Sequence, residues 1–195
     1  MEGQTSDGDG LRHQMDRWIA DLQPGAAGYL GSTGGVAADG RVILLARFES
    51  EESARANSDR PEQGEWWAET EKLFEGPVSF IESSDVGLFL GGGSDDAGFV
   101  QIMKNPDADR EELSKLDEGA EERVRKARPD LIGSIRVWTG PRSYIQAAYF
   151  TSVADARQAE DEGPAEEIEE RYEEMQEAMS EVEFIDLDDP ILNSA

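Results

Sequence analysis

The sequence contains no cysteine and one histidine, His13, among its 195 residues. Without cysteine the chain has no disulfide, no thiolate metal ligand and no cysteine nucleophile. With one imidazole it cannot build a metal site of two or three histidines, and a Ser-His-Asp triad would have to use His13. Because His13 stands among polar neighbours in a helical segment, we expect an ordinary surface residue. These absences exclude many common catalytic sites.

Positive charge is also scarce, since 18 Lys and Arg residues stand against 44 Asp and Glu residues and give a formal net charge of −26. Nucleic acids and anionic lipid surfaces attract basic side chains, so neither is an expected partner. No apolar segment approaches the roughly 20 residues that span a bilayer, and residues 1–10 lack the features of a signal peptide. The expected location is therefore the cytoplasm. The composition suits a salt-adapted host or a high-GC genome equally well.

Short sequence matches recur at a nearly constant distance along the chain. Residues 30–32 (LGS) return as 132–134 (IGS), a shift of 132 − 30 = 102 positions. Three further matches follow in the same order: Phe48 with Phe150, Ala54-Arg55 with Ala156-Arg157, and 78–82 (VSFIE) with 182–186 (VEFID). The last pair is 104 positions apart, as one loop insertion would produce. The sequence therefore predicts two copies of one unit of about 100 residues.

Hydrophobic periodicity predicts the same order of elements in both halves. The first half is expected to form a helix over 11–22, strands over 27–36 and 41–48, a helical region over 51–74 capped by Ser50, and a strand over 77–83. The second is expected to form a strand over 98–104, a helix from an Asp109 cap to about 127, strands over 131–138 and 143–150, a helix over 153–179 and a strand over 181–187. This βαββαβ order is ferredoxin-like.

The predicted domains are 1–90 and 98–195, joined by a glycine-rich linker over 91–97. The first unit has no apolar stretch before Leu11, so its opening strand is expected to be missing, and the run 86–90 could occupy that edge. Strands 41–48 and 143–150 are apolar on both faces, and exposing such a face is costly. We therefore expect an α+β protein in which two ferredoxin-like repeats form an intramolecular dimeric α+β barrel. Such a chain would be a monomer with an internal pseudo-dimer, or a weak homodimer.

One stretch of the first unit resembles a known family. Residues 47–54 (RFESEESA), followed by Asn57-Ser58, Pro61 and Trp66, are similar to the antibiotic-biosynthesis-monooxygenase-like branch of the dimeric α+β barrel superfamily. The family often has histidine where this chain has Asn57. The resemblance implies a small aromatic or quinol-type substrate and no cofactor, with Asn57 and Trp66 as the residues carried over by position.

Several large or charged side chains have two interpretations. Trp66, Trp138 and Tyr149 either pack in the core, which is the more usual role of large aromatic residues, or line a cavity that binds a flat ligand. Arg47 and Arg136 stand within apolar strands, where each either pairs with a carboxylate, the favoured interpretation, or faces a cavity and anchors a ligand.

Two functions follow from these patterns. The first is a small-molecule-binding α+β barrel that acts as a cofactor-independent monooxygenase, with Trp66, Asn57, Arg47, Trp138 and Tyr149 as the candidate substrate-binding residues. The second is a non-catalytic ligand-binding or protein-interaction module on the same fold. The acidic runs and the glycines at 31–35 and 91–93 are interpreted as solvated surface, turns and linker, and no metal site is expected.

Overall fold

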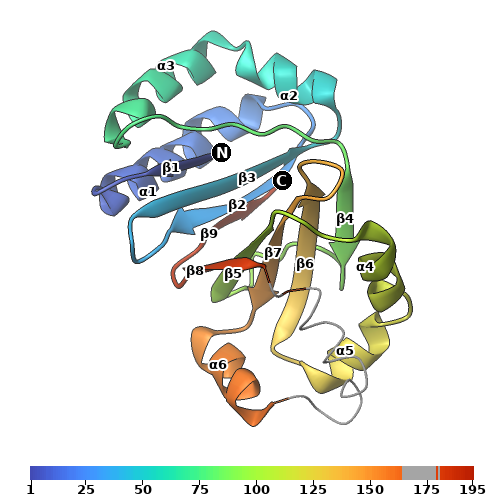
Figure 1. Cartoon of the computed structure of the whole chain (residues 1–195). Coiled ribbons are helices and arrows are strands. Elements are labelled where there is room, and N and C mark those ends of the chain that lie inside the picture. Colours follow the sequence, from blue (N-terminus) through green and yellow to red (C-terminus); the bar gives the residue numbers. More distant parts are fainter. Residues whose placement is uncertain (164–178, 180) are drawn as a thin grey trace. The chain divides into compact units, whose positions relative to one another are not determined.

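A computed structural model gives the structure of the chain and describes residues 1–163, 179 and 181–195 (Figure 1). The chain divides into two units, each with one antiparallel sheet. The first unit comprises Met1–Ser84 and Asp189–Ala195, and the second comprises Asp85–Asp188. The fold class is therefore α+β, as the sequence predicts. The division differs from the predicted domains at both boundaries, because residues 85–90 belong to the second unit and 189–195 to the first.

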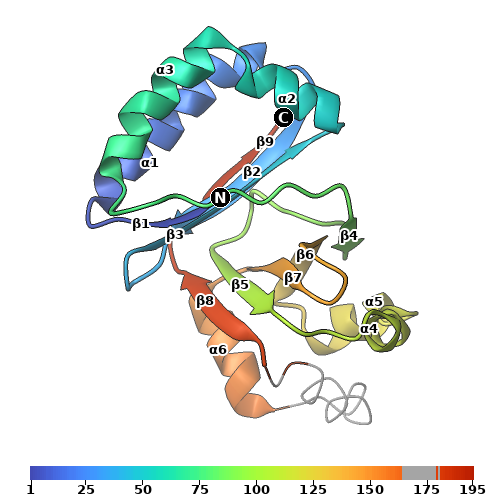
Figure 2. The same cartoon turned by 45° about the horizontal axis from the view of Figure 1, so that its top comes forward.

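The sheet of the first unit has the order β1-β3-β2-β9. Its strands are β1 (Glu2–Gln4), β2 (Tyr29–Val36), β3 (Arg41–Phe48) and β9 (Ile191–Ser194). Its helices are α1 (Gly8–Arg17), a π-helical turn (Trp18–Leu22), 3-10 turns (Gln23–Gly25 and Glu71–Leu73), α2 (Glu51–Ser58) and α3 (Pro61–Thr70). Figure 2 shows α1, α2 and α3 on one side of this sheet. Leu11, Met15 and Trp66 pack there against Val42 and Ile191.

The sheet of the second unit has the order β4-β6-β7-β5-β8. Its strands are β4 (Val86–Phe89), β5 (Phe99–Asn105), β6 (Leu131–Trp138), β7 (Tyr144–Phe150) and β8 (Glu183–Leu187). Its helices are α4 (Arg110–Asp117), α5 (Glu121–Ala127) and α6 (Val153–Glu162). The sequence order of β5, β6, β7 and β8 and their places in the sheet are those of a ferredoxin-like unit, with β4 added beside β6. Even-numbered residues of β7 face the helices, because Tyr144 packs on Leu113 of α4 and Ala148 near Ala156 of α6.

Local signals placed the helix starts correctly. Ser50 caps α2 by accepting a hydrogen bond from the Ser53 amide over 3.1 Å, and Asp109 caps α4 by accepting from the amides of Glu111 and Glu112. Two of the predicted long helices, over 51–74 and 109–127, are divided, however. Pro61 opens a new helix after Arg60, and the turn 118–120 separates α4 from α5.

Three edge predictions were wrong. The first unit does have an opening strand, β1, which is short and polar but pairs with β3 in the place an opening strand takes. Residues 77–83 form no strand, and contribute one bridge between Ser79 and Glu2. Val86–Phe89 pairs with β6 of the second unit and does not fill the edge of the first.

The predicted helix over 153–179 is present as α6 up to Glu162, and residues 164–178 lie outside the described part.

The central hairpins of the two units share one irregularity. The pairing of β2 with β3 shifts register between Tyr29 and Gly31, and that of β6 with β7 shifts between Leu131 and Gly133. Both bulges bring a glycine close to another backbone segment: a Cβ on Gly31 would lie 2.8 Å from the carbonyl of Asn193 in β9, and one on Gly133 would overlap the carbonyl of Gly92, just after β4. Glycine is therefore required at both positions.

Candidate functional site

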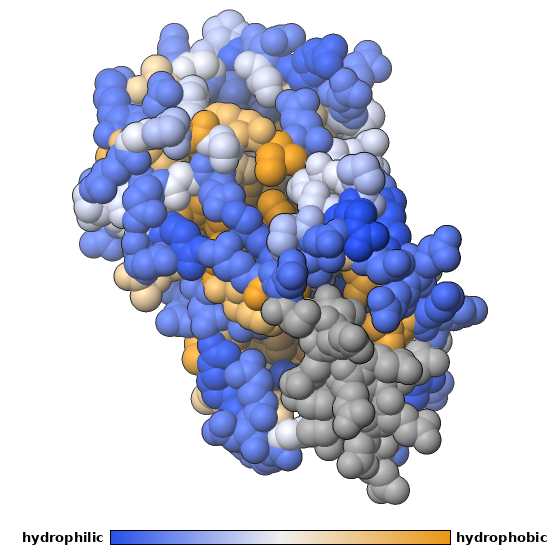
Figure 3. All heavy atoms as spheres, viewed as in Figure 1, coloured by the Kyte–Doolittle hydropathy of each residue, from blue (hydrophilic) through white to orange (hydrophobic). Residues whose placement is uncertain are grey.

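A cavity of about 560 Å³ lies in the second unit, a volume within the range that small-molecule sites occupy. It is bounded by β4, by the connection from α4 to α5, and by the helix-facing side of β6 and β7. The lining residues are Gly87, Leu88, Phe89, Asp117, Gly119, Glu121, Glu122, Ser134, Arg136 and Gln146. Hydrophilic residues cover most of the face seen in Figure 3, as the net charge of the chain leads one to expect.

Arg136 is the only cation among the described lining residues, and three contacts fix its orientation. Its Nε donates a hydrogen bond to Oε1 of Gln146 over 2.6 Å, and its Nη1 donates to Oδ2 of Asp117 over 2.6 Å. The guanidinium carbon lies 5.1 Å from the centre of the Tyr144 ring. Its side chain, 18 % exposed, thus lines the cavity in a held position and has N–H groups beyond those used in these two hydrogen bonds.

The register of the sheet explains why the cavity lies in this unit. Arg136 pairs with Gln146 across β6 and β7, whereas Gly34 pairs with Leu44 at the position 102 residues earlier across β2 and β3. Leu44 covers Gly34 and packs on the core of the first unit. Polar side chains that need hydrogen-bond partners replace a close-packed apolar pair in the second unit, and the space above them is open.

The connection above the cavity is acidic. Gly119 has a φ of +60°, a left-handed conformation that lets the chain turn from α4 into α5. Glu121 opens α5, and its Oε1 accepts a hydrogen bond from the Leu90 amide over 3.0 Å, which ties α5 to the end of β4. Glu122 is exposed beside it. The cavity thus combines apolar surface from Phe89, which pairs with Ser134 and shares its face of the sheet, with a fixed arginine and a rim of carboxylates.

None of the five predicted site residues is among the described residues that line this cavity. Trp66 is 6 % exposed in the core of the first unit, where its Nε1 donates to the Gln14 carbonyl over 2.8 Å. Asn57 is buried and accepts a hydrogen bond from Arg60 over 3.0 Å. Arg47 lies half-buried on β3, opposite Gly31 of β2.

The other two predicted residues belong to the second unit. Trp138 stands on the same side of β6 as Arg136, and its ring lies 5.4 Å from that of Tyr144 and 3.9 Å from the Arg110 guanidinium. Tyr149 is fully buried, and it is an odd-numbered residue of β7, so it faces away from the helices of its unit and from the cavity.

Sequence reasoning identified Arg136 as either paired or facing a cavity, and the structure shows both. It missed Asp117, Ser134 and Gln146. A comparison of the halves position by position would have found Gln146, because it replaces Leu44 on a strand whose other helix-facing residues are apolar in both units. Asp117 carries no comparable signal among so many carboxylates.

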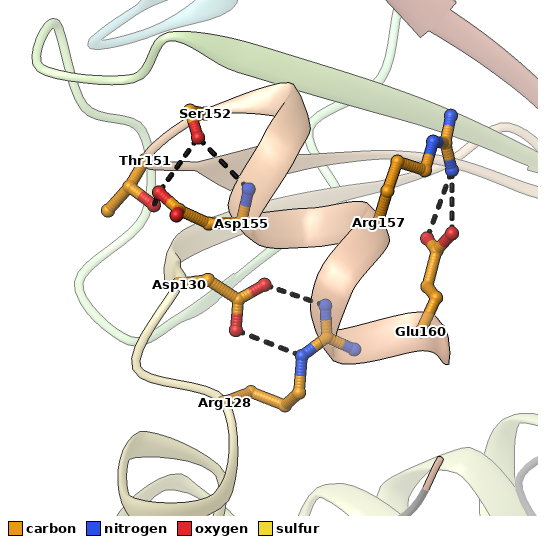
Figure 4. Close-up of polar contacts among 7 residues, drawn as sticks. All are labelled: Arg128, Asp130, Thr151, Ser152, Asp155, Arg157 and Glu160. Carbon is orange, nitrogen blue, oxygen red and sulfur yellow. Dashed lines mark hydrogen bonds and ion pairs between the residues drawn. The ribbon is translucent and has the colours of Figure 1, made fainter. Parts of the chain in front are cut away.

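A second group of polar contacts surrounds α6 (Figure 4). The hydroxyls of Thr151 and Ser152 donate to Asp155, and these hydrogen bonds hold the pKa of its carboxyl below the ordinary value. Arg157 donates to Glu160, which raises the pKa of the guanidinium, with smaller contributions from Asp186. Arg128 binds Asp130 through two hydrogen bonds. These contacts are local to α6 and its neighbouring loop, and the hydrogen bond from Arg157 to Asp186 also links α6 to β8.

Metal binding finds no support in the described ranges. No cluster of three or more His, Asp or Glu side chains there is arranged to hold an ion. No helix in the same ranges has the length and apolar character needed to cross a membrane.

Comparison with known proteins gives the fold a context. No protein-family model and no curated protein sequence matches the chain. The chain is similar to a candidate monooxygenase of Lactobacillus acidophilus NCFM, with a TM-score of 0.70 and 10 % identity over 99 % of this chain and 97 % of that one. It is also similar to a candidate monooxygenase of Fusobacterium nucleatum subsp. nucleatum, with a TM-score of 0.75 and 7 % identity over 99 % and 91 % of the two chains.

A third solved structure, an anthrone oxidase-like protein, gives a TM-score of 0.63 and 12 % identity over 100 % of this chain and 91 % of that one. At such identities the likeness establishes the fold and not the activity. The chain therefore has, over nearly its whole length, the α+β fold of these monooxygenase-like proteins.

Proposed function

We propose that this protein binds a small, flat aromatic molecule in the cavity of the second unit and oxidises it with O2 without a cofactor. The observation that carries the proposal is Arg136, held by Gln146 and Asp117 on the floor of a cavity of about 560 Å³. Phe89 supplies apolar surface for a ring system, and Ser134 supplies a buried hydroxyl. The likeness to two candidate monooxygenases and an anthrone oxidase-like protein supports this choice of chemistry.

The reaction that suits such a site starts from an aromatic ketone, or the keto tautomer of a quinol, with an acidic CH2 group. One C–H proton passes to a cavity carboxylate or to water, and the resulting oxyanion accepts hydrogen bonds from Arg136, whose charge stabilises it. The carbanion gives two electrons to O2 and forms a C–O bond, which yields a hydroperoxide after protonation. The O–O bond then breaks, the second C–H proton leaves, water departs with one oxygen, and the carbon keeps the other as a carbonyl.

A second candidate is a protein that binds the same ligand without reacting with it. This alternative is favoured by the pairing of Arg136, whose charge is already balanced by Asp117. It is also favoured by the lining residues described, which include no histidine to serve as a base near neutral pH.

Oxygen uptake by the purified full chain with anthrone and with a hydroquinone tests the proposal. The expected result is one O2 consumed per product, with about a 100-fold loss of rate in Arg136→Gln, as for removal of an oxyanion-stabilising donor. Arg142→Gln is the matched control, because Arg142 is also paired with an aspartate, Asp107, but is exposed and outside the cavity. If the protein bound these compounds without taking up oxygen, the second candidate would be established. If it showed neither binding nor oxygen uptake, both candidates would be overturned.

We also propose that the units arose by tandem duplication of one ferredoxin-like unit, within the monooxygenase-like branch that residues 47–66 resemble. Support comes from the bulges at Gly31 and Gly133 and from the serine caps of α2 and α6 at Ser50 and Ser152, each pair 102 positions apart. An alignment of homologous chains in which the halves align with each other at this shift would test it, and halves that align only with unrelated families would contradict it.

A further inference from the structure

We infer that the cavity of the second unit selects uncharged ligands that carry a carbonyl or phenol oxygen, and that Asp117 is the residue that excludes anionic ones. This inference rests on the proposed function, since it concerns the ligand of the same cavity. It adds a class of ligand and a residue that determines specificity.

The described lining of the cavity carries more negative than positive charges. One cation, Arg136, stands with three carboxylates, those of Asp117, Glu121 and Glu122, among the described lining residues. Asp117 is bound directly to Arg136 over 2.6 Å, and 45 % of its side chain is exposed. An arginine without this carboxylate would attract a carboxylate or phosphate of a ligand, because its fork of N–H groups matches both. Here an anion would have to replace Asp117 or approach it closely, against like-charge repulsion.

The donors that remain suit a neutral oxygen. A guanidinium has five N–H groups, of which Nε donates to Gln146 and one N–H of Nη1 to Asp117, so three are left for a ligand and its surroundings. Ser134 stands two residues from Arg136 on the same side of β6, and it is only 3 % exposed. A carbonyl or phenol oxygen can accept hydrogen bonds from these donors while Asp117 stays in place. Such a ligand therefore binds without breaking the ion pair between Arg136 and Asp117.

The walls fit the same class of ligand. Phe89 on the edge strand β4 pairs with Ser134 and so lies on the cavity side of the sheet, whereas Leu88 pairs with Ile135 and faces the other side. Gly87 has no side chain, and a Cβ added there would meet no atom within 4 Å. A ring system can therefore lie against apolar surface at β4 with its oxygen toward β6.

Two probes that differ only in charge test the inference: anthraquinone-2-carboxamide and anthraquinone-2-carboxylate, titrated against the full chain by calorimetry. The wild type is expected to favour the carboxamide by at least about tenfold. Asp117→Asn keeps an acceptor for Nη1 but removes the charge, so the ratio of the two affinities should fall by about tenfold in this variant.

Glu118→Gln is the matched control, because it removes one negative charge at the next, exposed residue, outside the cavity lining. It should leave the ratio at the wild-type value. Equal affinities of the wild type for both probes, or equal changes of the ratio in Asp117→Asn and Glu118→Gln, would overturn the inference and leave the proposed function standing. If the wild type bound neither probe nor any neutral anthrone or quinol, the proposed function would fail with it.

Discussion

Nε of Arg136 donates to Oε1 of Gln146 over 2.6 Å across β6 and β7, at the place where the first unit pairs Gly34 with Leu44. Two sheets with the same central register thus differ in what fills the space under their helices. In the first unit this space holds an apolar core that includes Trp66, and in the second it holds the polar floor of a cavity. The structural difference between the units at this place follows from these few positions.

Filling the cavity from β4 should abolish ligand binding without loss of the fold. Gly87 lines the cavity, and nothing lies within 4 Å of a Cβ added to it, so Gly87→Leu can be accommodated and its side chain would occupy ligand space. We expect at least about a tenfold loss of affinity for a neutral quinone, and a stability unchanged or raised by about 0.5 kcal/mol because a strand glycine is replaced. Gly87→Ala should show the stability effect with little loss of affinity, and equal losses in both variants would contradict this account.

Trp66 should matter for stability and not for ligand binding. Trp66→Phe removes the hydrogen bond from Nε1 to the Gln14 carbonyl and part of a buried ring, so we expect a loss of about 1–3 kcal/mol in the free energy of unfolding. Trp67→Phe, a change at its half-buried neighbour, should cost less. Denaturant titration followed by circular dichroism measures both. A drop in quinone affinity in Trp66→Phe, with the fold intact, would return Trp66 to the binding site.

Two glycines in open surroundings should respond to alanine with opposite signs. A Cβ on Gly64 or on Gly76 would meet no atom within 4 Å, but Gly64 lies inside α3 whereas Gly76 has a φ of +85°. Gly64→Ala should therefore stabilise the protein by about 0.5–1 kcal/mol, because alanine favours the helix. Gly76→Ala should destabilise it by about 1 kcal/mol, because alanine is strained in the left-handed region. Changes of the same sign in chemical denaturation would contradict the backbone assignment.

The cap of α4 should make stability depend on pH in the acid range. Hydrogen bonds from the amides of Glu112 and Glu111 hold the pKa of the Asp109 carboxyl below its ordinary value of 3.8. The unfolded chain therefore binds this proton at a higher pH than the folded one, so the stabilisation is present above the ordinary pKa and is lost as the pH falls through the folded value. Asp109→Asn keeps a capping side chain and does not titrate.

The difference in stability between wild type and Asp109→Asn should accordingly shrink as the pH is lowered from about 5 to about 3. Urea titrations of both proteins at several pH values measure it. A difference that stays constant over this range would show that the carboxylate of Asp109 is not stabilised by the helix start.

The strands at the centre of each sheet and the edge strand β8 could be predicted from the sequence, whereas the edge strands β1, β4 and β9 were not assigned correctly. β3 and β6 have the predicted bounds because dense β-branched and aliphatic runs define them. The polar strand β1 exists because β3 offers an open edge, a tertiary cause that no local pattern reports. Tertiary pairing also decides β4 and β9. β4 falls in the predicted first domain but joins the sheet of the second unit, and β9 falls in the predicted second domain but joins the sheet of the first.

The cavity of the second unit was not predicted from the sequence. Trp66 was given two interpretations, core packing and the wall of a cavity, and it is packed in the core of the first unit, as the favoured interpretation had it. Large aromatic side chains fill space as readily as they line it, so their type alone did not discriminate. Arg136 was the informative residue, since a charge within an apolar strand requires a reason. The expectation that the two sheets cover each other stays a prediction.

The crystal structure of the full chain with a neutral anthraquinone tests the central claim most directly. The account predicts a ring system against Phe89, with an oxygen within hydrogen-bond distance of the Arg136 guanidinium and the contact between Arg136 and Asp117 intact. A ligand seated beside Trp66 in the first unit, or a cavity of the second unit left empty at saturating ligand, would contradict it.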